Sequence, residues 1–302
     1  MTKQITVGYD GSGPSSEAVM WAADEAAARG ARLKILSCYQ IPYAGDVVFG
    51  WTATDAYASL LAATESGLVE IKGFASDAHP GLEITTEATA GPPGFDLVRD
   101  ADPDDLVVVG ASGHERGPAF WLGNTAHHVV RHSPCPVVVM RGPANRGHPD
   151  RIVVGVDGSP ASELALRWAG DEADRHGVPL VVVHSWSYPY APTDAAASQA
   201  RDLTRVDAAT VVDRAVAVAR VRCGVDVTGE LVEGSPVWAL LQAVGDGDLL
   251  VLGSRGRGAV AAGLFGSTVN SVLDHCVVPV VVVRCQGDKA ERAAPLTLIR
   301  IE

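Results

Sequence analysis

The stretch Gln4-Ile-Thr-Val-Gly-Tyr-Asp10-Gly-Ser12 returns 147 positions later as Arg151-Ile-Val-Val-Gly-Val-Asp157-Gly-Ser159. Each copy is an apolar run of strand length that ends in glycine and aspartate and leads into a helical pattern. The register holds as far as Leu33 and Leu180, so the chain repeats one strand–helix–strand unit. A repeat of this kind sets the number of domains, which makes it the first feature to establish.

Glycine and proline positions extend the repeat toward the C-terminus. Four pairs lie 143 positions apart: Gly91 and Gly234, Gly110 and Gly253, Gly123 and Gly266, and Pro136 and Pro279. Between the copies, residues 142–149 read Gly-Pro-Ala-Asn-Arg-Gly-His-Pro, and such residues break regular structure. We predict a first module at residues 1–142, a linker at 143–150, a second module at 151–285 and a tail at 286–302.

Strand-like and helical segments alternate within each copy. In the first module, the expected strands are residues 5–9, 33–39, 84–88, 106–109 and 137–140, and the expected helices are residues 15–29, 57–78, 95–101 and 125–132. Strands such as Leu106–Val109 and Val280–Val283 lack polar alternation, which is typical of strands covered by helices on both faces. The sequence therefore predicts two α/β modules, each a doubly wound parallel sheet with helices on both faces.

Composition excludes several classes of partner. A net charge of −12 leaves no basic surface for nucleic acid, and no apolar run approaches the roughly 18 residues that span a bilayer. The first ten residues do not resemble a secretory leader.

The five cysteines are odd in number and show no CxxC spacing: Cys38, Cys135, Cys223, Cys276 and Cys285. Partly buried thiols are favoured over redox sensors or metal ligands. We expect a cytoplasmic, bacterial protein.

The predicted strand ends carry residues suited to phosphate binding. Strand one of the second module ends in Gly155 and Asp157, and strand four leads into Gly253-Ser-Arg-Gly-Arg-Gly258. Nine residues then separate Gly256 from Gly266-Ser267-Thr268 at the start of a helix. Glycines let backbone N–H groups approach oxygens closely, and a helix start adds partial positive charge. Glycine also serves turns and helix caps without any ligand, so this loop alone decides nothing.

The string Gly-x2-Gly-x9-Gly-Ser, at Gly253, Gly256, Gly266 and Ser267, resembles the signature of the ATP-binding branch of the universal stress protein family. The resemblance covers about residues 3–141 and 151–285. It implies a two-domain member in which each module is a five-stranded parallel sheet with strand order 3-2-1-4-5. It also implies ATP as the ligand, with Mg²⁺ as the ion that could accompany its phosphates.

Carried over by position, the resemblance places adenine near Ser185, ribose near Asp157, and the phosphates against the two glycine segments. The residues expected to bind nucleotide in the second module are Gly155, Asp157, Ser185, Gly253, Ser254, Arg255, Gly256, Arg257, Gly258, Ala259, Gly266, Ser267, Thr268 and Val269. The arginines and hydroxyls could add hydrogen bonds to a polyphosphate. Asp-Gly-Ser is also a good turn sequence, in which Asp157 would cap the next helix.

The first module departs from this pattern. Its expected nucleotide-binding residues are Gly8, Asp10, Cys38, Gly110, Gly113, Gly123, Asn124 and Thr125. Asn124 stands where the family has serine or threonine, although Thr125 follows it. Glu115 brings a negative charge where the second module has Gly258, and only Arg116 is basic. We therefore predict weaker nucleotide binding in the first module.

The motifs for fast chemistry are missing from the sequence. There is no Gly-x4-Gly-Lys-Ser/Thr loop, and the glycine-rich turn follows strand four rather than strand one, which disfavours a dinucleotide oxidoreductase. The first hypothesis is a non-enzymatic, nucleotide-dependent stress-response regulator with at most slow hydrolysis. The second is a protein-interaction scaffold with structural glycine loops, and the third is a weak ATPase or adenylate-transferring enzyme.

Other residues receive structural interpretations. His127, His128 and His132 do not recur as a set in the second copy, so no metal site is expected there. Trp21 and Trp168 occupy matching helical positions and are expected in the core. The apolar fifth strands carry few charges that would protect an edge, so we expect the modules to pair along them within the chain. A homodimer is left open.

Overall fold

The first module contains five strands and four helices in strict alternation. The computed structural model describes residues 2–40, 53–112, 122–141, 148–188, 195–256 and 266–284. The elements of the first module are β1 (Gln4–Gly8), α1 (Gly13–Arg29), β2 (Arg32–Tyr39), α2 (Ala53–Ala78), β3 (Ile84–Ala90), α3 (Pro93–Arg99), β4 (Leu106–Gly110), α4 (Asn124–His132) and β5 (Val137–Met140). Every element expected from the sequence is present, with its ends within four residues of the expected ones.

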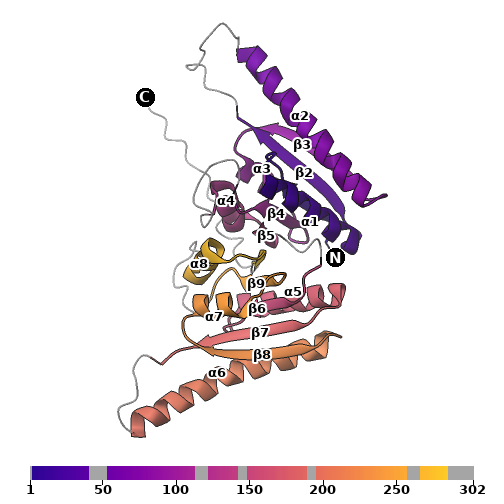
Figure 1. The fold of residues 1–302 in the computed structure, drawn as a ribbon. Helices are drawn as coiled ribbons and strands as arrows, with labels where there is room; N and C mark the ends of the chain where they lie inside the picture. Colours follow the sequence, from indigo (N-terminus) through magenta and orange to yellow (C-terminus); the bar gives the residue numbers. More distant parts are fainter. Residues whose placement is uncertain are drawn as a thin grey trace, which may run out of the picture.

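The second module repeats this order (Figure 1). Its elements are β6 (Ile152–Gly155), α5 (Pro160–His176), β7 (Leu180–Trp186), α6 (Ala195–Arg222), β8 (Val227–Glu233), α7 (Pro236–Ala243), β9 (Leu249–Gly253), α8 (Ser267–His275) and β10 (Val280–Val283). The long helices α2 and α6 lie at the two far ends of the molecule.

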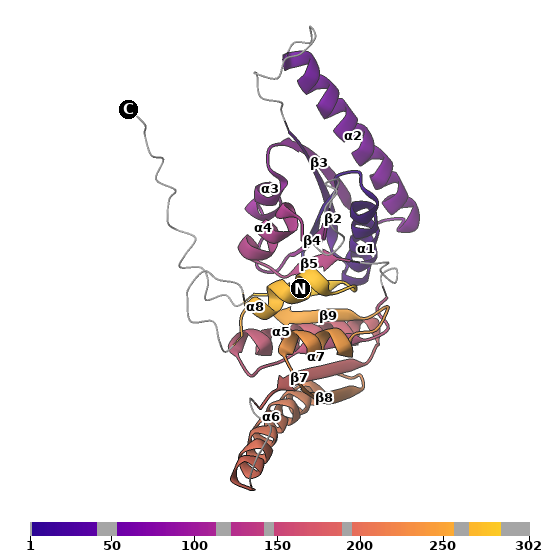
Figure 2. The same ribbon diagram turned by 60° about the vertical axis from the view of Figure 1, so that its left-hand side comes forward.

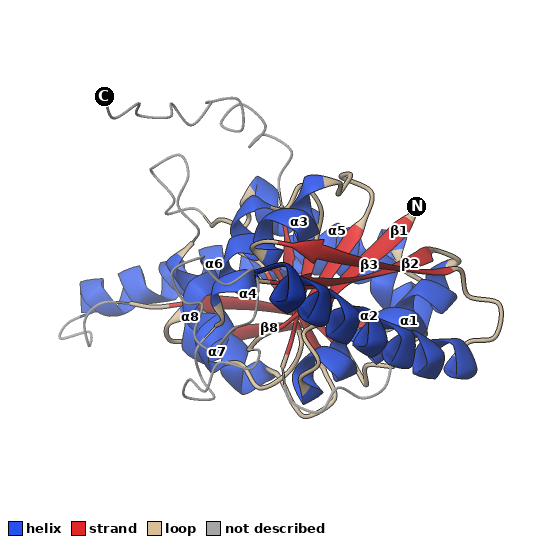
Figure 3. Cartoon of the chain, turned by 90° about the horizontal axis from the view of Figure 1, so that it is seen from above, coloured by secondary structure: helices blue, strands red, loops and turns tan. Residues whose placement is uncertain are grey.

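The ten strands form one sheet with the order β3-β2-β1-β4-β5-β10-β9-β6-β7-β8. Within each module the pairs are parallel and the order is 3-2-1-4-5, which confirms the predicted fold. The two modules join at β5 and β10, which pair antiparallel with Val138 opposite Val281. Figure 3 shows the strands running between helices that lie on both sides.

Two apolar cores lie on opposite faces of this sheet. Successive residues of β4 face different cores: Val108 belongs to the core formed with α1, α2, α5 and α6, and Val107 to the core formed with α3, α4, α7 and α8. Figure 2 shows the two helix layers separated by the sheet. Trp21 is buried in the first core and Trp168 packs against it, which confirms their predicted role. None of the described helices is both long and apolar enough to span a bilayer.

Helices α1 and α5 have matching ends because the repeat keeps their capping residues. Ser12 and Ser159 are the N-caps, and each side chain accepts a hydrogen bond from the backbone N–H three residues later. Gly30 and Gly177 end the helices with φ values of 63° and 65°, a left-handed conformation that glycine adopts without steric cost. The two helices therefore have the same length and start at the same point of each module.

Arginines at equivalent positions tie the modules together beyond the β5–β10 pairs. The Arg284 guanidinium, just after β10, donates hydrogen bonds to the Arg131 carbonyl and, at 3.3 Å, to the Ser133 carbonyl, at the C-terminus of α4. Arg141, just after β5, is buried near Asp274 and Cys276 at the end of α8. A cation at a helix C-terminus satisfies carbonyls that have no partner within the helix. Arg284 thus stabilises the end of α4 across the joint, and Arg141 lies at the equivalent end of α8.

We predict that Arg284→Ala lowers the free energy of unfolding by about 1–3 kcal/mol, because the partly buried α4 carbonyls lose a charged donor. Arg167→Ala, at an exposed position of α5, serves as the control and should change stability little. Urea unfolding of both variants measures the difference. Equal stability of the two variants would contradict the capping role of Arg284.

Candidate functional site

The first strand of each module marks the point where the chain reverses its winding direction. Strand β6 lies between β7 and β9, and β1 lies between β2 and β4. Ligand sites of doubly wound sheets lie outside the carboxyl ends of strands at such a switch point. We call the carboxyl ends of β6 and β9, with the turns that follow them, the second-module site, and those of β1 and β4 the first-module site.

Asp157 holds the turn between β6 and α5. Its Oδ1 accepts a hydrogen bond from the Ser159 backbone N–H at 2.9 Å, and Ser159 Oγ in turn accepts one from the Ser162 N–H at 3.2 Å. The interpretation that aspartate caps the helix is therefore wrong, because Ser159 is the cap and Asp157 supports the residue that caps. The same arrangement occurs in the first module, where Asp10 Oδ1 accepts from the Ser12 N–H at 3.0 Å.

Gly253 and Gly256 allow the end of β9 to approach the β6 turn closely. A Cβ atom on Gly253 would lie 2.6 Å from the carbonyl carbon and oxygen of Ala161, in the first turn of α5. A Cβ atom on Gly256 would lie 2.6 Å from Asp157 Oδ2. The structure thus brings Asp157 and Gly256 together, as expected, and only glycine fits at Gly253 without a backbone shift.

The start of α8 lies beside the same loop. The Gly266 N–H donates to the Ser254 carbonyl at 3.3 Å, and a Cβ atom on Gly266 would be 3.9 Å from the Gly256 nitrogen. Gly266 is the N-cap residue of α8, so no side chain caps the helix there. Ser267 is exposed and Thr268 half-buried at the first two helical positions, where N–H groups lack intrahelical partners. These donors favour an anion at this place.

Val269 differs from the expectation in one respect. Its side chain is 4% exposed and packs in the apolar core with Val272 and Leu273, so only its backbone could contact a ligand. Val269 is the third residue of α8 and lies on the apolar face that an amphipathic helix turns to the core, so packing explains why it is hydrophobic.

Ser254, directly after β9, carries a buried hydroxyl beside the glycine loop. Ser254 is 2% exposed, and its Oγ has no hydrogen-bond partner among the described residues. Buried hydroxyls are normally paired, so an unpaired one next to Gly253 fits a site that accepts a polar ligand. The equivalent residue of the first module is Ala111, which offers no such group.

The ends of β2 and β7 differ in their electrostatics. Cys38 Sγ lies 3.9 Å from Asp96 Oδ2 of α3, and burial together with this carboxylate raises the pKa of the Cys38 thiol to about 12. In the second module, Ser185 takes the place of Cys38 and Ala239 that of Asp96. The sequence analysis did not single out Asp96. Aligning the two copies with the offset of 143 residues shows that the first copy has this acid where the second has Ala239.

The phosphate side of the first-module site is partly described. Gly123 is the N-cap of α4, with its N–H donating to the Ala111 carbonyl at 2.7 Å, and Asn124 and Thr125 follow at the first helical positions. Gly8 and Gly155 end β1 and β6, and Gly110 ends β4. Arg255 is half-buried directly beside Gly256. The predictions for Gly113, Glu115, Arg116, Arg257, Gly258 and Ala259 fall outside the described residues.

Comparison with protein families agrees with this architecture. The model of the universal stress protein family matches residues 1–141 and 149–284. The chain belongs to this family. A universal stress protein of Mycolicibacterium smegmatis is 30% identical over 295 residues, covering 93% of this chain and 96% of the relative. One of Mycobacterium tuberculosis (strain H37Rv) is 31% identical over 301 residues, with the same coverage of both chains.

Solved structures share the two-module fold of this universal stress protein. A universal stress protein from Archaeoglobus fulgidus superposes with a TM-score of 0.68 at 21% identity, covering 94% of this chain and 98% of the other. A functionally unknown protein from Pseudomonas aeruginosa reaches 0.64 at 14% identity, covering 94% and 93%. At these identities the likeness concerns the fold alone.

Three other residue sets of this universal stress protein contain groups capable of chemistry. Cys135 and Cys276 are buried and Cys38 and Cys223 half-buried, and burial raises the pKa of all four thiols, which suits structural cysteines. His128 and His132 stack with ring centroids 4.1 Å apart, while Phe95 packs on His128. Glu25, Glu172 and His176, in contrast, bring three oxygen and nitrogen atoms within 4.8 Å of one another, at the joint between the modules.

We predict that Gly253→Ala lowers the free energy of unfolding by about 1–3 kcal/mol, because its methyl group meets backbone atoms of α5 that cannot move alone. Gly110→Ala is the matched control, since a Cβ atom there would find its nearest neighbour at 3.5 Å, an ordinary contact. Its expected change is within about 0.5 kcal/mol. Urea unfolding compares the two, and equal losses would contradict the closer approach at Gly253.

Proposed function

We propose that this universal stress protein binds ATP at the second-module site and acts as a nucleotide-dependent regulator of the stress response. The observation that carries the proposal is the convergence of Asp157, Gly256 and the start of α8 outside the switch point of the sheet. A carboxylate suited to sugar hydroxyls and backbone donors suited to phosphates lie side by side there. This combination fits a nucleotide better than it fits a simple anion.

In this proposal, different residues contact the ribose, the phosphates and the adenine of the nucleotide. Asp157 is the acceptor for the ribose hydroxyls, with one oxygen fixed by the Ser159 N–H and the other next to Gly256. The N–H groups of Gly256 and of the first turn of α8, together with Ser267 and Thr268, are the donors for the phosphates. Adenine lies near Ser185 at the end of β7, and Mg²⁺ would neutralise part of the phosphate charge.

Slow hydrolysis at most is the expected chemistry. The P-loop lysine of fast ATPases is absent from the sequence, and Asp157 is engaged in holding its turn rather than positioned as a base. A site that binds nucleotide without turning it over rapidly suits a regulator whose state follows the nucleotide supply. A weak ATPase remains the enzymatic alternative.

The first-module site is proposed to bind nucleotide more weakly. It lacks the Ser254 hydroxyl, it has Asn124 in place of Ser267, and it carries the Asp96 carboxylate beside Cys38. Ala111 removes a donor, Asn124 replaces the compact serine hydroxyl with a larger amide, and Asp96 adds a negative charge that disfavours an anionic ligand.

One observation favours the alternative of a protein-interaction scaffold. Gly253 is required by the close approach of α5, so this glycine has a structural explanation that needs no ligand. For Gly256, the close neighbour among the described residues is a side-chain oxygen, Asp157 Oδ2, rather than the backbone, so packing explains this glycine less completely. The scaffold would act through partner contacts. Homodimer formation and a cytoplasmic location remain predictions.

We predict that Gly256→Glu abolishes the strong ATP site while leaving the fold intact, because the new carboxylate fills the phosphate space beside Asp157. Isothermal titration calorimetry of the wild type should give about one strong site per chain and, at most, a weaker second one. Gly73→Glu is the control with the same added charge, at an exposed position of α2 where a Cβ atom meets nothing within 4 Å.

Wild-type binding retained by Gly256→Glu would remove the site assignment. Equal loss in Gly73→Glu would show that net charge, rather than the site, governs affinity. Two equal strong sites in the wild type would contradict the proposed difference between the modules. Absence of ATP binding in every form would leave the scaffold as the better hypothesis.

A further inference from the structure

The last turns of α1 and α5 meet at the joint between the modules, far along each helix from the candidate sites. Five ionisable side chains gather there, which we call the clasp residues: Glu25, Arg29, Glu172, Arg175 and His176. Two come from the first module and three from the second. Their contacts therefore join the modules directly, independently of any nucleotide.

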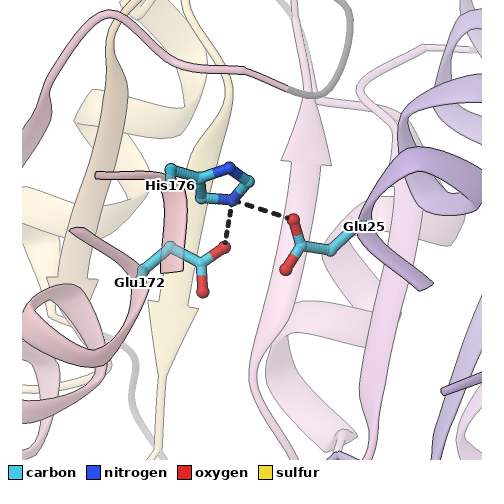
Figure 4. Close-up of side chains that lie close together, drawn as sticks. All are labelled: Glu25, Glu172 and His176. Carbon is cyan, nitrogen blue, oxygen red and sulfur yellow. Dashed lines mark hydrogen bonds and ion pairs between the residues drawn. The ribbon is translucent and has the colours of Figure 1, made fainter. Parts of the chain in front are cut away.

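His176 stands between the two carboxylates (Figure 4). Its Nε2 lies 3.2 Å from Glu25 Oε2 and 3.1 Å from Glu172 Oε1. The three side chains are almost completely buried, with exposures of 0% for Glu25, 1% for Glu172 and 3% for His176. Two carboxylates this deep in the protein need positive charge close by, because water does not screen them.

The arginines hold the outer oxygens of the same carboxylates. Arg29 bonds Glu25 Oε1 within α1 and reaches Glu172 Oε2 at 2.6 Å across the joint. Arg175 bonds Glu172 Oε2 from the other side. The inner oxygens are left to His176, so each carboxylate is held between a guanidinium and the imidazole.

Comparison of the two copies shows that the histidine at position 176 is specific to the second one. Glu25 and Glu172 are equivalent residues, and so are Arg29 and His176, because both pairs lie 147 positions apart. Two identical copies would place an arginine at both positions. The second copy has a histidine instead, which exchanges a permanent cation for one that can lose its proton.

The surroundings of His176 favour its charged form. Burial opposes protonation, but the hydrogen bonds to Glu172 and Glu25 outweigh it and raise the pKa of His176 to about 9. Burial also works against ionisation of Glu25, yet the His176 hydrogen bond and the Arg29 charge lower its pKa to about 2. Burial raises the pKa of Glu172, so this carboxylate depends most on its cationic neighbours.

Two further groups face the clasp residues. The ring of His148, just before β6, lies edge-on to His176 with centroids 5.4 Å apart. Arg29 lies 5.5 Å above the ring of Trp168, which stabilises a cation on that side. Neither His148 nor Trp168 carries a fixed positive charge that would oppose a protonated His176.

We propose that His176, when protonated, holds Glu25 of α1 against Glu172 of α5 and so acts as a pH-sensitive clasp between the two modules. The contribution of His176 to the free energy of unfolding depends on pH in a definite direction. Because the imidazole binds its proton more tightly in the folded chain, the contribution is fully present below the unfolded pKa near 6.5 and is lost as the pH rises through about 9. Alkaline conditions are therefore expected to loosen the joint.

A divalent metal ion at the same three atoms is disfavoured by charge. Arg29 and Arg175 already balance the two carboxylates, so a divalent ion would leave two net positive charges at a buried site, whereas a proton on His176 leaves one. A protonated His176 is thus favoured over a divalent ion bound to Glu25, Glu172 and His176.

The first test measures stability against pH in two variants of His176. The buried thiols lower stability at alkaline pH in every variant, because burial raises their pKa. Beyond that, loss of the His176 proton should lower the folded-to-unfolded ratio of the wild type by about 140-fold between pH 6.5 and 10. His176→Arg restores the residue of the other copy and should remove this loss. His176→Gln should be less stable at pH 7 and should also lack the His176 part of the alkaline loss. His275→Gln, at an exposed histidine of α8, should keep it.

The second test locates the effect at the joint. Hydrogen exchange at pH 10 should be faster in the wild type than in His176→Arg for the last turns of α1 and α5, and equal for β2 and β3; at pH 6.5 the two proteins should match. NMR titration should give His176 a pKa near 9. An alkaline loss in His176→Gln as large as that of the wild type, a His176 pKa near 6.5, or stabilisation of the wild type but not of His176→Gln by Zn²⁺ would each overturn the proposal.

Discussion

The pairing of strand one with strand four in each module is the constraint on which the rest of the structure depends. Because β6 pairs with β9 and β1 with β4, the chain must wind away from strand one in both directions, and the two turns at the carboxyl ends come to lie together. The end of β9 then lies so close to the first turn of α5 that only glycine fits at position 253. Gly266 starts α8 against the same loop. The candidate site follows from this pairing rather than from any single loop.

Much of this could be read from the sequence. The repeat followed from constant offsets between apolar runs and glycines, because such patterns are copied as a unit. The meeting of the turns with Asp157 and Gly256 followed from the rule that ligand sites lie at the carboxyl ends of parallel strands. The strand order was implied by the resemblance to the family. The helix cap was misjudged at Asp157, since aspartate and serine two residues apart both suit a cap and only the backbone angles decide. The Glu25–His176 contact could not be foreseen, because it joins residues 151 positions apart through the docking of two modules.

Duplication within one chain lets equivalent positions take different roles. Ser254 and Ala111, Ala239 and Asp96, and His176 and Arg29 are all such pairs. The first two pairs distinguish the candidate sites, because the second module has the additional hydroxyl and lacks the additional carboxylate. The third pair places a titratable cation at the joint. The symmetric fold is thus retained while its chemistry becomes asymmetric, which a dimer of identical chains could not achieve.

Nucleotide binding is the central claim, and the most direct measurement is of what the protein carries with it. Freshly purified protein is denatured, and the small molecules released are separated by chromatography and identified. ATP binding at the second-module site predicts adenine nucleotide in the supernatant. An empty supernatant, together with no calorimetric signal when ATP is added to the native protein, would contradict it.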